Sequence, residues 1–303
     1  MRIGLIDIDG HNYPNLALMK VSAFYKARGH KVDWVDYFNN YDIVYQSKVF
    51  TYTPDNNFYV NCDLIVKGGT GYDCLITLPD NIDKTQPDYS LYPKFTSAYG
   101  FITRGCPNKC SWCIVPKKEG NIHPYMDVEE IARDRKEVVL MDNNILASEW
   151  GLQQIEKIVK LKLKVDFNQG LDARFIARDV EVVKLLSKVK WHPVLRMSCD
   201  SSVMMEPIQK AVELLRKYGC KPQRYFIYVL LRDFNESYNR VNFCINLKLD
   251  VHSQPFMDFT KTQNIPQWQK DMAKYTNRHV LCKTVDFKDY RIRKNFSCAE
   301  YFK

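Results

Sequence analysis

This chain of 303 residues lacks any run of about 18 uncharged apolar residues, so no transmembrane helix is expected. It also lacks the marks of a secretory signal. Residues 1–7 have the pattern of a buried strand. Acidic residues interrupt the apolar run after a few positions, and no small-residue cleavage site follows. Ten cysteines in a chain without an export signal indicate reduced thiols. We therefore predict a cytoplasmic protein that does not associate with membranes.

The usual cysteine pattern of a structural zinc site is also missing. Such sites commonly pair one C-x2-C with a second, distant pair. This chain has Cys106, Cys110 and Cys113 in one loop at C-x3-C-x2-C spacing, and no second close pair. A [4Fe–4S] cluster normally takes four cysteines, so three on one loop leave one iron open to a non-protein ligand. The spacing favours such a cluster over a zinc site or three unrelated buried thiols.

The loop at 105–113, with the sequence GCPNKCSWC, resembles that of the radical S-adenosylmethionine (SAM) enzymes, whose pattern is C-x3-C-x-aromatic-C. Trp112 occupies the aromatic position. The resemblance implies that Cys106, Cys110 and Cys113 hold a [4Fe–4S] cluster whose open iron binds the amino and carboxylate groups of SAM. It further implies reductive cleavage of SAM to a 5′-deoxyadenosyl radical that acts on an unidentified substrate. A flavodoxin-like or ferredoxin-like donor would supply the electron.

Residues 1–90 predict a small Rossmann-like domain with a parallel sheet. Apolar runs at 3–8, 32–35 and 62–66 indicate strands, and the mixed polar and apolar segment 41–50 is a further candidate. The spacing over 16–28 indicates a helix that ends at Gly29. A strand, a helix and a second strand in that order favour a right-handed parallel crossover. A polar linker at 80–92, with prolines in it and beside it, marks the domain boundary.

This first domain resembles the cobalamin-binding domains that precede some radical SAM barrels. Asp9-Gly10-His11 matches the start of their D-x-H-x-x-G motif, in which the histidine ligates cobalt. Pro14 stands where the glycine of the motif should be, and no S-x-L follows at the usual spacing. The resemblance therefore leaves two alternatives: a Rossmann-like domain without cobalamin, or a cobalamin-dependent methyltransferase with His11 as ligand.

Residues 91–262 repeat a strand–helix unit six times, which predicts an α/β domain. The repeat is about 28 residues long, close to the size of one βαβ unit, and six repeats are too few for an eight-stranded barrel. This count matches the partial (β/α)6 TIM-like barrel of the radical SAM family. The predicted strands are 98–103, 137–141, 164–167, 194–197, 224–231 and 249–253.

The polar residues at the carboxyl ends of these strands are the candidate SAM contacts, because barrel enzymes place their sites there. By its resemblance to the family, the second strand end, with Asp142 and Asn143, would bind the amino group. Arg174 or Arg196 would hold the carboxylate through a bidentate fork. The remaining candidates are Trp112, whose backbone would meet adenine, Gln169, Ser198 and Asp200 (the last two at the ribose), and Cys199, either a catalytic thiol or a buried one.

The segment 263–303 is a basic, aromatic C-terminal extension. From residue 261 onward it has ten Lys and Arg against four Asp and Glu, so it carries most of the net charge of +9. Cations can meet phosphates and aromatic rings can stack on bases. The extension therefore leaves two alternatives: contact with an anionic or nucleic-acid substrate, or a solvated surface whose aromatic residues belong to the core. It also leaves open a non-catalytic Fe–S module that binds nucleic acid.

Overall fold

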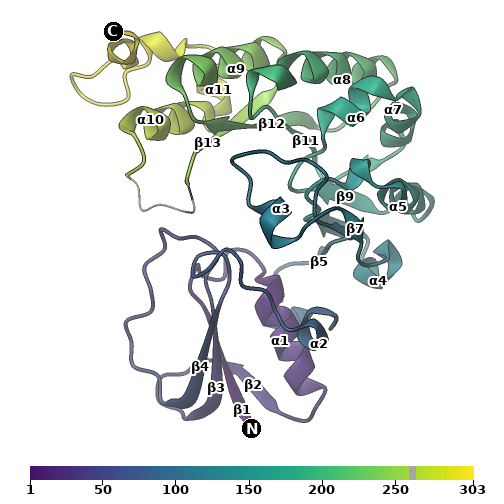
Figure 1. Ribbon diagram of the computed structural model, residues 1–303, viewed down its shortest axis with the longest axis vertical. Helices are drawn as coiled ribbons and strands as arrows, with labels where there is room; N and C mark the ends of the chain where they lie inside the picture. The colour runs from purple at the N-terminus through teal and green to yellow at the C-terminus, as the bar shows by residue number, and fades with distance from the viewer. Residues whose placement is uncertain (259–263) are drawn as a thin grey trace. The chain divides into compact units, whose positions relative to one another are not determined.

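The computed structural model describes residues 1–258 and 264–303 and divides the chain into two compact units, Met1–Ser97 and Ala98–Lys303 (Figure 1). Both units are mixed α/β structures built on parallel sheets. The predicted fold class, a Rossmann-like unit together with a partial barrel, is therefore confirmed. No helix in the described ranges is both long enough and apolar enough to span a membrane.

The first unit holds a four-stranded sheet in the order β2-β1-β3-β4. All its neighbours are parallel. The strands are β1 (Arg2–Asp7), β2 (Lys31–Trp34), β3 (Tyr41–Ser47) and β4 (Cys62–Gly68). Helix α1 (Leu16–Lys26) crosses from β1 to β2, and α2 (Asp80–Asp83) lies beside it (Figure 1).

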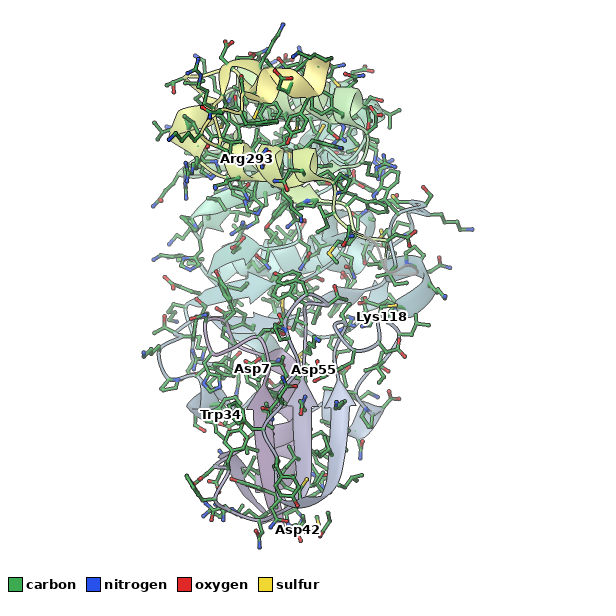
Figure 2. The ribbon with its side chains drawn as sticks, turned by 90° about the vertical axis from the view of Figure 1, so that its left-hand side faces the viewer. Asp7, Trp34, Asp42, Asp55, Lys118 and Arg293 are labelled. Atoms are coloured by element: carbon green, nitrogen blue, oxygen red, sulfur yellow. The ribbon has the colours of Figure 1, made fainter. Side chains whose placement is uncertain are left out.

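Two apolar clusters, one on each face of the sheet, stabilise the first unit. Ile3, Leu5 and Leu18 are buried between the sheet and α1, and Ile6 and Val44 belong to the cluster on the opposite face. Successive strand residues point to opposite faces, which explains why one short strand serves both clusters. The carboxyl ends of the strands carry acids: Figure 2 shows Asp7 and Asp55 at this end of the sheet and Asp42 at the other.

The second unit holds six parallel strand positions in chain order: β5 (Ala98–Gly100), β8 (Glu137–Leu140), β9 (Lys164–Phe167), β10 and β11, β12 (Arg224–Leu231) and β13 (Asp250–Pro255). The fourth position is broken. Its first part, β10 (Lys190–Trp191), pairs with β9, and its second part, β11 (Val194–Ser198), pairs with β12. Pro193 lies at the break, where its missing N–H cannot join a ladder.

Helices of the second unit bury the apolar residues of these strands. Ile227, Val229 and Leu231 of β12 have no exposed surface, whereas the alternate residues on the other face are half-buried. The helices are α3 (Val115–Lys118), α4 (Val128–Ala132), α5 (Glu149–Lys160), α6 (Ala173–Arg178), α7 (Val180–Ser187), α8 (Met205–Lys217), α9 (Phe234–Asn246), α10 (Gln267–Thr276) and α11 (His279–Cys282). Of these, α3, α6, α10 and α11 were not predicted.

The burial of the C-terminal aromatic residues favours one of the two alternatives for this segment, the one in which they belong to the core. Tyr275, Phe287 and Tyr290 are 1%, 0% and 9% exposed and belong to the same core as the barrel strands. Helix α10 packs on β13, which draws the end of the chain into this core. These buried rings are therefore not free to stack on nucleic-acid bases. The segment from 267 onward is part of the second unit.

Candidate site at the cysteine loop

The loop with the three cysteines follows β5, at the carboxyl end of the parallel sheet, and is closed by a two-stranded stem. Strand β6 (Thr103–Arg104) pairs antiparallel with β7 (His123–Pro124). Inside the stem, the Cys106 amide donates to the Gly120 carbonyl at 3.2 Å. Gly105 has φ +79°, and a Cβ at this position would lie 2.3 Å from the Asn121 carbonyl oxygen. Only glycine fits there, so it fixes the turn into the first cysteine.

Glu119 joins both arms of this loop. Its carboxylate accepts a bidentate pair of hydrogen bonds from Arg104, at 3.0 and 2.9 Å. It also accepts from the Gly105 amide and from Asn143 Nδ2, both at 2.9 Å. The side chains of Arg104 and Glu119 are 19% and 12% exposed. Four donors on one largely buried carboxylate hold the loop against the strand end that follows β8.

Asp142, at the end of β8, holds the chain where it enters the loop. Its carboxylate accepts from the Ile102 amide at 3.0 Å and from Thr103 Oγ1 at 2.7 Å, and the Thr103 amide also donates to it. The residue is 4% exposed. Burial raises its pKa to about 6, although the hydrogen bonds act in the opposite direction. The predicted SAM contact at Asp142 is thus occupied by donors of the chain itself, and here the residue positions the loop.

This raised pKa predicts an unusual pH dependence of stability. The pKa of Asp142 is higher in the folded state than its ordinary value of 3.8, so the stabilisation is present below pH 4 and is lost as the pH rises through about 6. Relative to Asp142→Asn, which does not titrate, we expect the wild type to gain up to about 3 kcal/mol in the free energy of unfolding between pH 7 and pH 4. Urea unfolding at several pH values measures both free energies. If the difference between the wild type and Asp142→Asn does not change with pH, the raised pKa of Asp142 is contradicted.

Asn144 lies next to the first cysteine and carries an unused acceptor. Its Nδ2 donates to Asp172 Oδ2 at 3.0 Å and lies 3.8 Å from Cys106 Sγ. The residue is 2% exposed, and its Oδ1 has no hydrogen-bond partner among the described residues. A buried acceptor without a donor is costly, so this oxygen is available to an N–H or O–H of a water molecule or a ligand. Asn144 was not among the predicted contacts, although it follows two that were.

Asp172 and Arg174 form the neighbouring wall. Asp172 is the N-cap of α6, and Arg174 in the first turn donates to it from Nε at 2.9 Å and from Nη2 at 2.6 Å. Burial alone would raise the pKa of Asp172, but the hydrogen bonds from Arg174 outweigh it and hold the pKa below its ordinary value. Arg174 is close enough to act electrostatically on Cys110. The predicted Arg174 therefore does lie beside the cysteines.

The thiols themselves act on one another. Burial, and then the charge of Cys113, raises the pKa of Cys110. Burial also raises the pKa of Cys113, with a contribution from Cys106. In residues 1–258 and 264–303 no three His, Cys, Asp or Glu side chains are arranged to hold a single metal ion.

Trp112, Ser198 and Asp200 are linked through Arg232. The guanidinium carbon of Arg232 lies 4.0 Å from the centre of the Trp112 ring, and Arg232 donates to the Asp200 carbonyl at 3.1 Å. Asp200 accepts from the Leu230 amide and interacts with Ser198, and burial raises its pKa. These residues link the cysteine loop to β11 and β12.

Arg196 lies within the barrel sheet and already has partners. Its Nε and Nη2 each donate to the Asp166 carboxylate at 2.7 Å, and its Nη1 donates to Tyr228 Oη at 3.2 Å. The pair is largely buried, at 17% and 9% exposure. The pair therefore forms a polar layer that links β9 of the four-stranded sheet to β11 of the three-stranded sheet. Asp166 and Tyr228 were not predicted, although a charge inside each of two short apolar strands is a signal that could have paired Asp166 with Arg196.

The three remaining candidates, Gln169, Cys199 and His11, differ in burial and in their neighbours. Gln169 is exposed. Cys199 is 0% exposed and contacts Cys244 in the core, so its thiol does not reach solvent as the chain stands. His11 belongs to the first unit, where its ring packs on Trp34 with centroids 4.1 Å apart.

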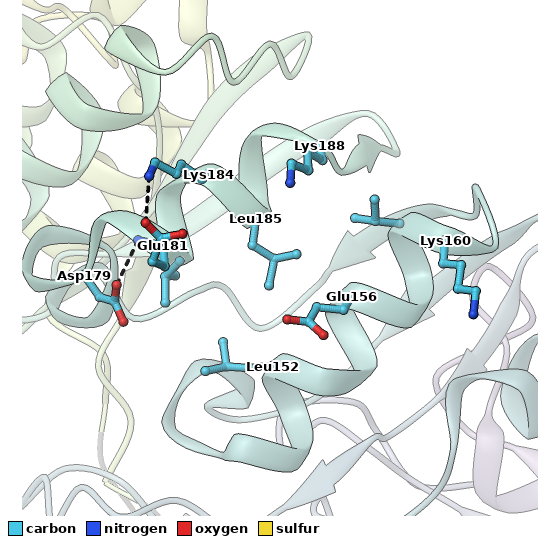
Figure 3. Close-up of a pocket in the computed structure, with 10 residues that line it drawn as sticks. Leu152, Glu156, Lys160, Asp179, Glu181, Lys184, Leu185 and Lys188 are labelled. Carbon is cyan, nitrogen blue, oxygen red and sulfur yellow. Dashed lines mark hydrogen bonds and ion pairs between the residues drawn. The ribbon is translucent and has the colours of Figure 1, made fainter.

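A groove of about 450 Å³ lies elsewhere in the second unit, between α5 and α7 (Figure 3). Leu152, Val159 and Leu185 form its apolar part, and charged residues such as Glu156 and Lys188 surround them. None of its lining residues belongs to the cysteine loop or to a strand end. The groove therefore does not coincide with the cysteine loop.

The fold and the site together define an open parallel α/β barrel with a three-cysteine loop at the carboxyl end of its first strand. No protein-family model and no curated protein matches the chain. Among solved structures, the chain is similar to SuiB of Streptococcus suis, with a TM-score of 0.41 and 15% sequence identity. The alignment covers 70% of this chain and 54% of the SuiB chain, so this chain spans about half of that protein.

Proposed function

We propose that this chain is a radical SAM enzyme in which Cys106, Cys110 and Cys113 hold a [4Fe–4S] cluster. When bound, the cluster would supply the electron that cleaves SAM, giving methionine and a 5′-deoxyadenosyl radical that acts on a substrate still to be identified. The observation that carries the proposal is the three-thiol loop, clamped by Glu119 at the carboxyl end of a parallel barrel sheet.

The residues around the loop have roles that suit SAM. Asn144 Oδ1, buried and without a donor, would accept from the amino group of the ligand. Arg174, held by Asp172 beside the cysteines, offers a cation to the carboxylate, since it is half-exposed on its other side. Asp142 and Glu119 act indirectly, because they fix the backbone that carries the thiols.

The polar layer that links β9 to β11 and β12 would receive the substrate. Arg196, Asp166 and Tyr228 form a layer of hydrogen bonds below the strand ends, and His252 stands against Tyr228 with ring centroids 5.9 Å apart. Burial, together with the charges of His279 and Arg196, lowers the pKa of His252. This imidazole is therefore neutral at pH 7 and can donate or accept a hydrogen bond there.

Anaerobic reconstitution of the full chain with iron and sulfide tests the proposal. We expect about four irons per chain, and formation of 5′-deoxyadenosine from SAM after reduction with dithionite. Parallel samples with hydroxocobalamin test the cobalamin-dependent alternative, with loss of bound cobalamin in His11→Ala as its signature. A protein that takes up zinc instead of iron, and never forms 5′-deoxyadenosine, would overturn the proposal.

A further inference from the structure

The outer strand of the first unit, β4, presents an open edge. It has seven residues, against four in β2 at the other edge, and no other strand of the described chain pairs with its outer side. Leu64 and Ile65 at its centre are 52% and 43% exposed. A long edge strand with exposed apolar residues is a template for pairing with another strand.

The backbone of β4 is oriented to accept such a partner. The Lys48 amide donates to the Gly68 carbonyl at 3.0 Å, so the polar groups of Gly68 face β3. Backbone groups alternate between the two sides along a strand. Those of Ile65 and Lys67 therefore face outward. By contrast β2 is short, and its Asp33 forms ion pairs with Arg2 and Lys31, which blunt that edge.

We propose that β4 pairs antiparallel with β4 of a second copy of this chain, about a two-fold axis through Ile65. In this register Asp63 lies opposite Lys67, and the two-fold axis produces that pair twice. Leu64 lies opposite Val66, so exposed apolar surface is covered as well. The two sheets become one sheet with four strands from each copy.

The charges favour a second copy over an unrelated strand. Asp63 is exposed and takes part in no ion pair within the described residues. Lys67 is 50% exposed. Its Nζ lies 3.8 Å from Asp55, a separation at which an exposed pair contributes little, and 5.2 Å from the centre of the Tyr72 ring. Opposite charges that face each other across antiparallel strands stabilise the pairing, and like charges oppose it.

Sedimentation velocity on the full chain over a range of concentration tests this dimer. The wild type should associate reversibly, and Asp63→Lys should weaken the association about tenfold or more, since it sets Lys opposite Lys twice. Lys67→Asp should do the same. The double variant D63K/K67D restores complementary charge and should return the dissociation constant to within about threefold of the wild type.

Lys31→Asp on β2 is the matched control, because it reverses a similar exposed charge on the other edge and should leave association unchanged. Thermal unfolding of each variant checks the fold, and added salt should weaken the wild-type dimer. A wild type that stays monomeric at every concentration would overturn the proposal. So would a dimer that Asp63→Lys leaves intact, or a double variant that does not recover. These results do not depend on the cysteine-loop function.

Discussion

Cys106→Ser is expected to abolish iron–sulfur binding and 5′-deoxyadenosine formation, a loss of at least about a thousandfold in rate. Cys106 is the first thiol of the loop, and its backbone is fixed by the Gly120 carbonyl and by the left-handed turn at Gly105. A serine hydroxyl at this position is a poor ligand for iron, because clusters bind thiolates. Iron content, visible absorbance and product formation after anaerobic reconstitution measure the effect.

Cys74→Ser is the control for this experiment. Cys74 is a half-buried thiol of the first unit, outside the loop. It should keep the iron content and the rate of the wild type. Equal loss in both variants would indicate general damage by cysteine removal, and an unchanged Cys106→Ser variant would contradict the cluster assignment.

Glu119→Ala is expected to give the second largest effect, through the shape of the loop. It removes the partner of Arg104, which is 19% exposed, and leaves the Gly105 amide and Asn143 without their acceptor. Removing one partner of a largely buried pair costs roughly 3–5 kcal/mol. If the intact loop is needed to retain the cluster, we expect iron content after gel filtration to fall about tenfold or more.

Glu119→Gln separates the charge of this residue from its hydrogen bonds. The amide oxygen can still accept from the Gly105 N–H, but it loses the charge that pairs with Arg104. Its iron content should therefore lie between those of Glu119→Ala and the wild type. Circular dichroism monitors the fold of both variants. Full iron retention by Glu119→Ala would show that the clamp does not control the loop.

Local patterns predicted the strands well. The bounds 164–167 and 224–231 were predicted from short apolar runs and agree with β9 and β12. Strand formation depends mainly on neighbouring residues of that kind, so it can be read from a short window. Helix α6 was missed because its six residues are too few to show a helical period, although its N-cap Asp172 is a local signal.

The site was only partly predictable. The cysteines were found because their spacing is local, and Arg174 does lie beside them. Glu119 and Asn144 were missed because their partners, Arg104 and Cys106, are 15 and 38 residues away in the chain. The sequence did not decide whether the C-terminal rings form a binding surface or part of the core, since composition alone does not show which face of a segment is buried.

The sequence by itself determined the three-cysteine loop, the strand–helix repeat and therefore the parallel α/β class, because each follows from spacing within a few residues. Only the tertiary structure decided which polar groups meet at the loop, that Asp142 is bonded to the backbone, and that the C-terminal aromatic residues belong to the core. The physical reason is that burial and hydrogen bonding between distant segments depend on how the strands are ordered in space. A linear pattern does not contain that order.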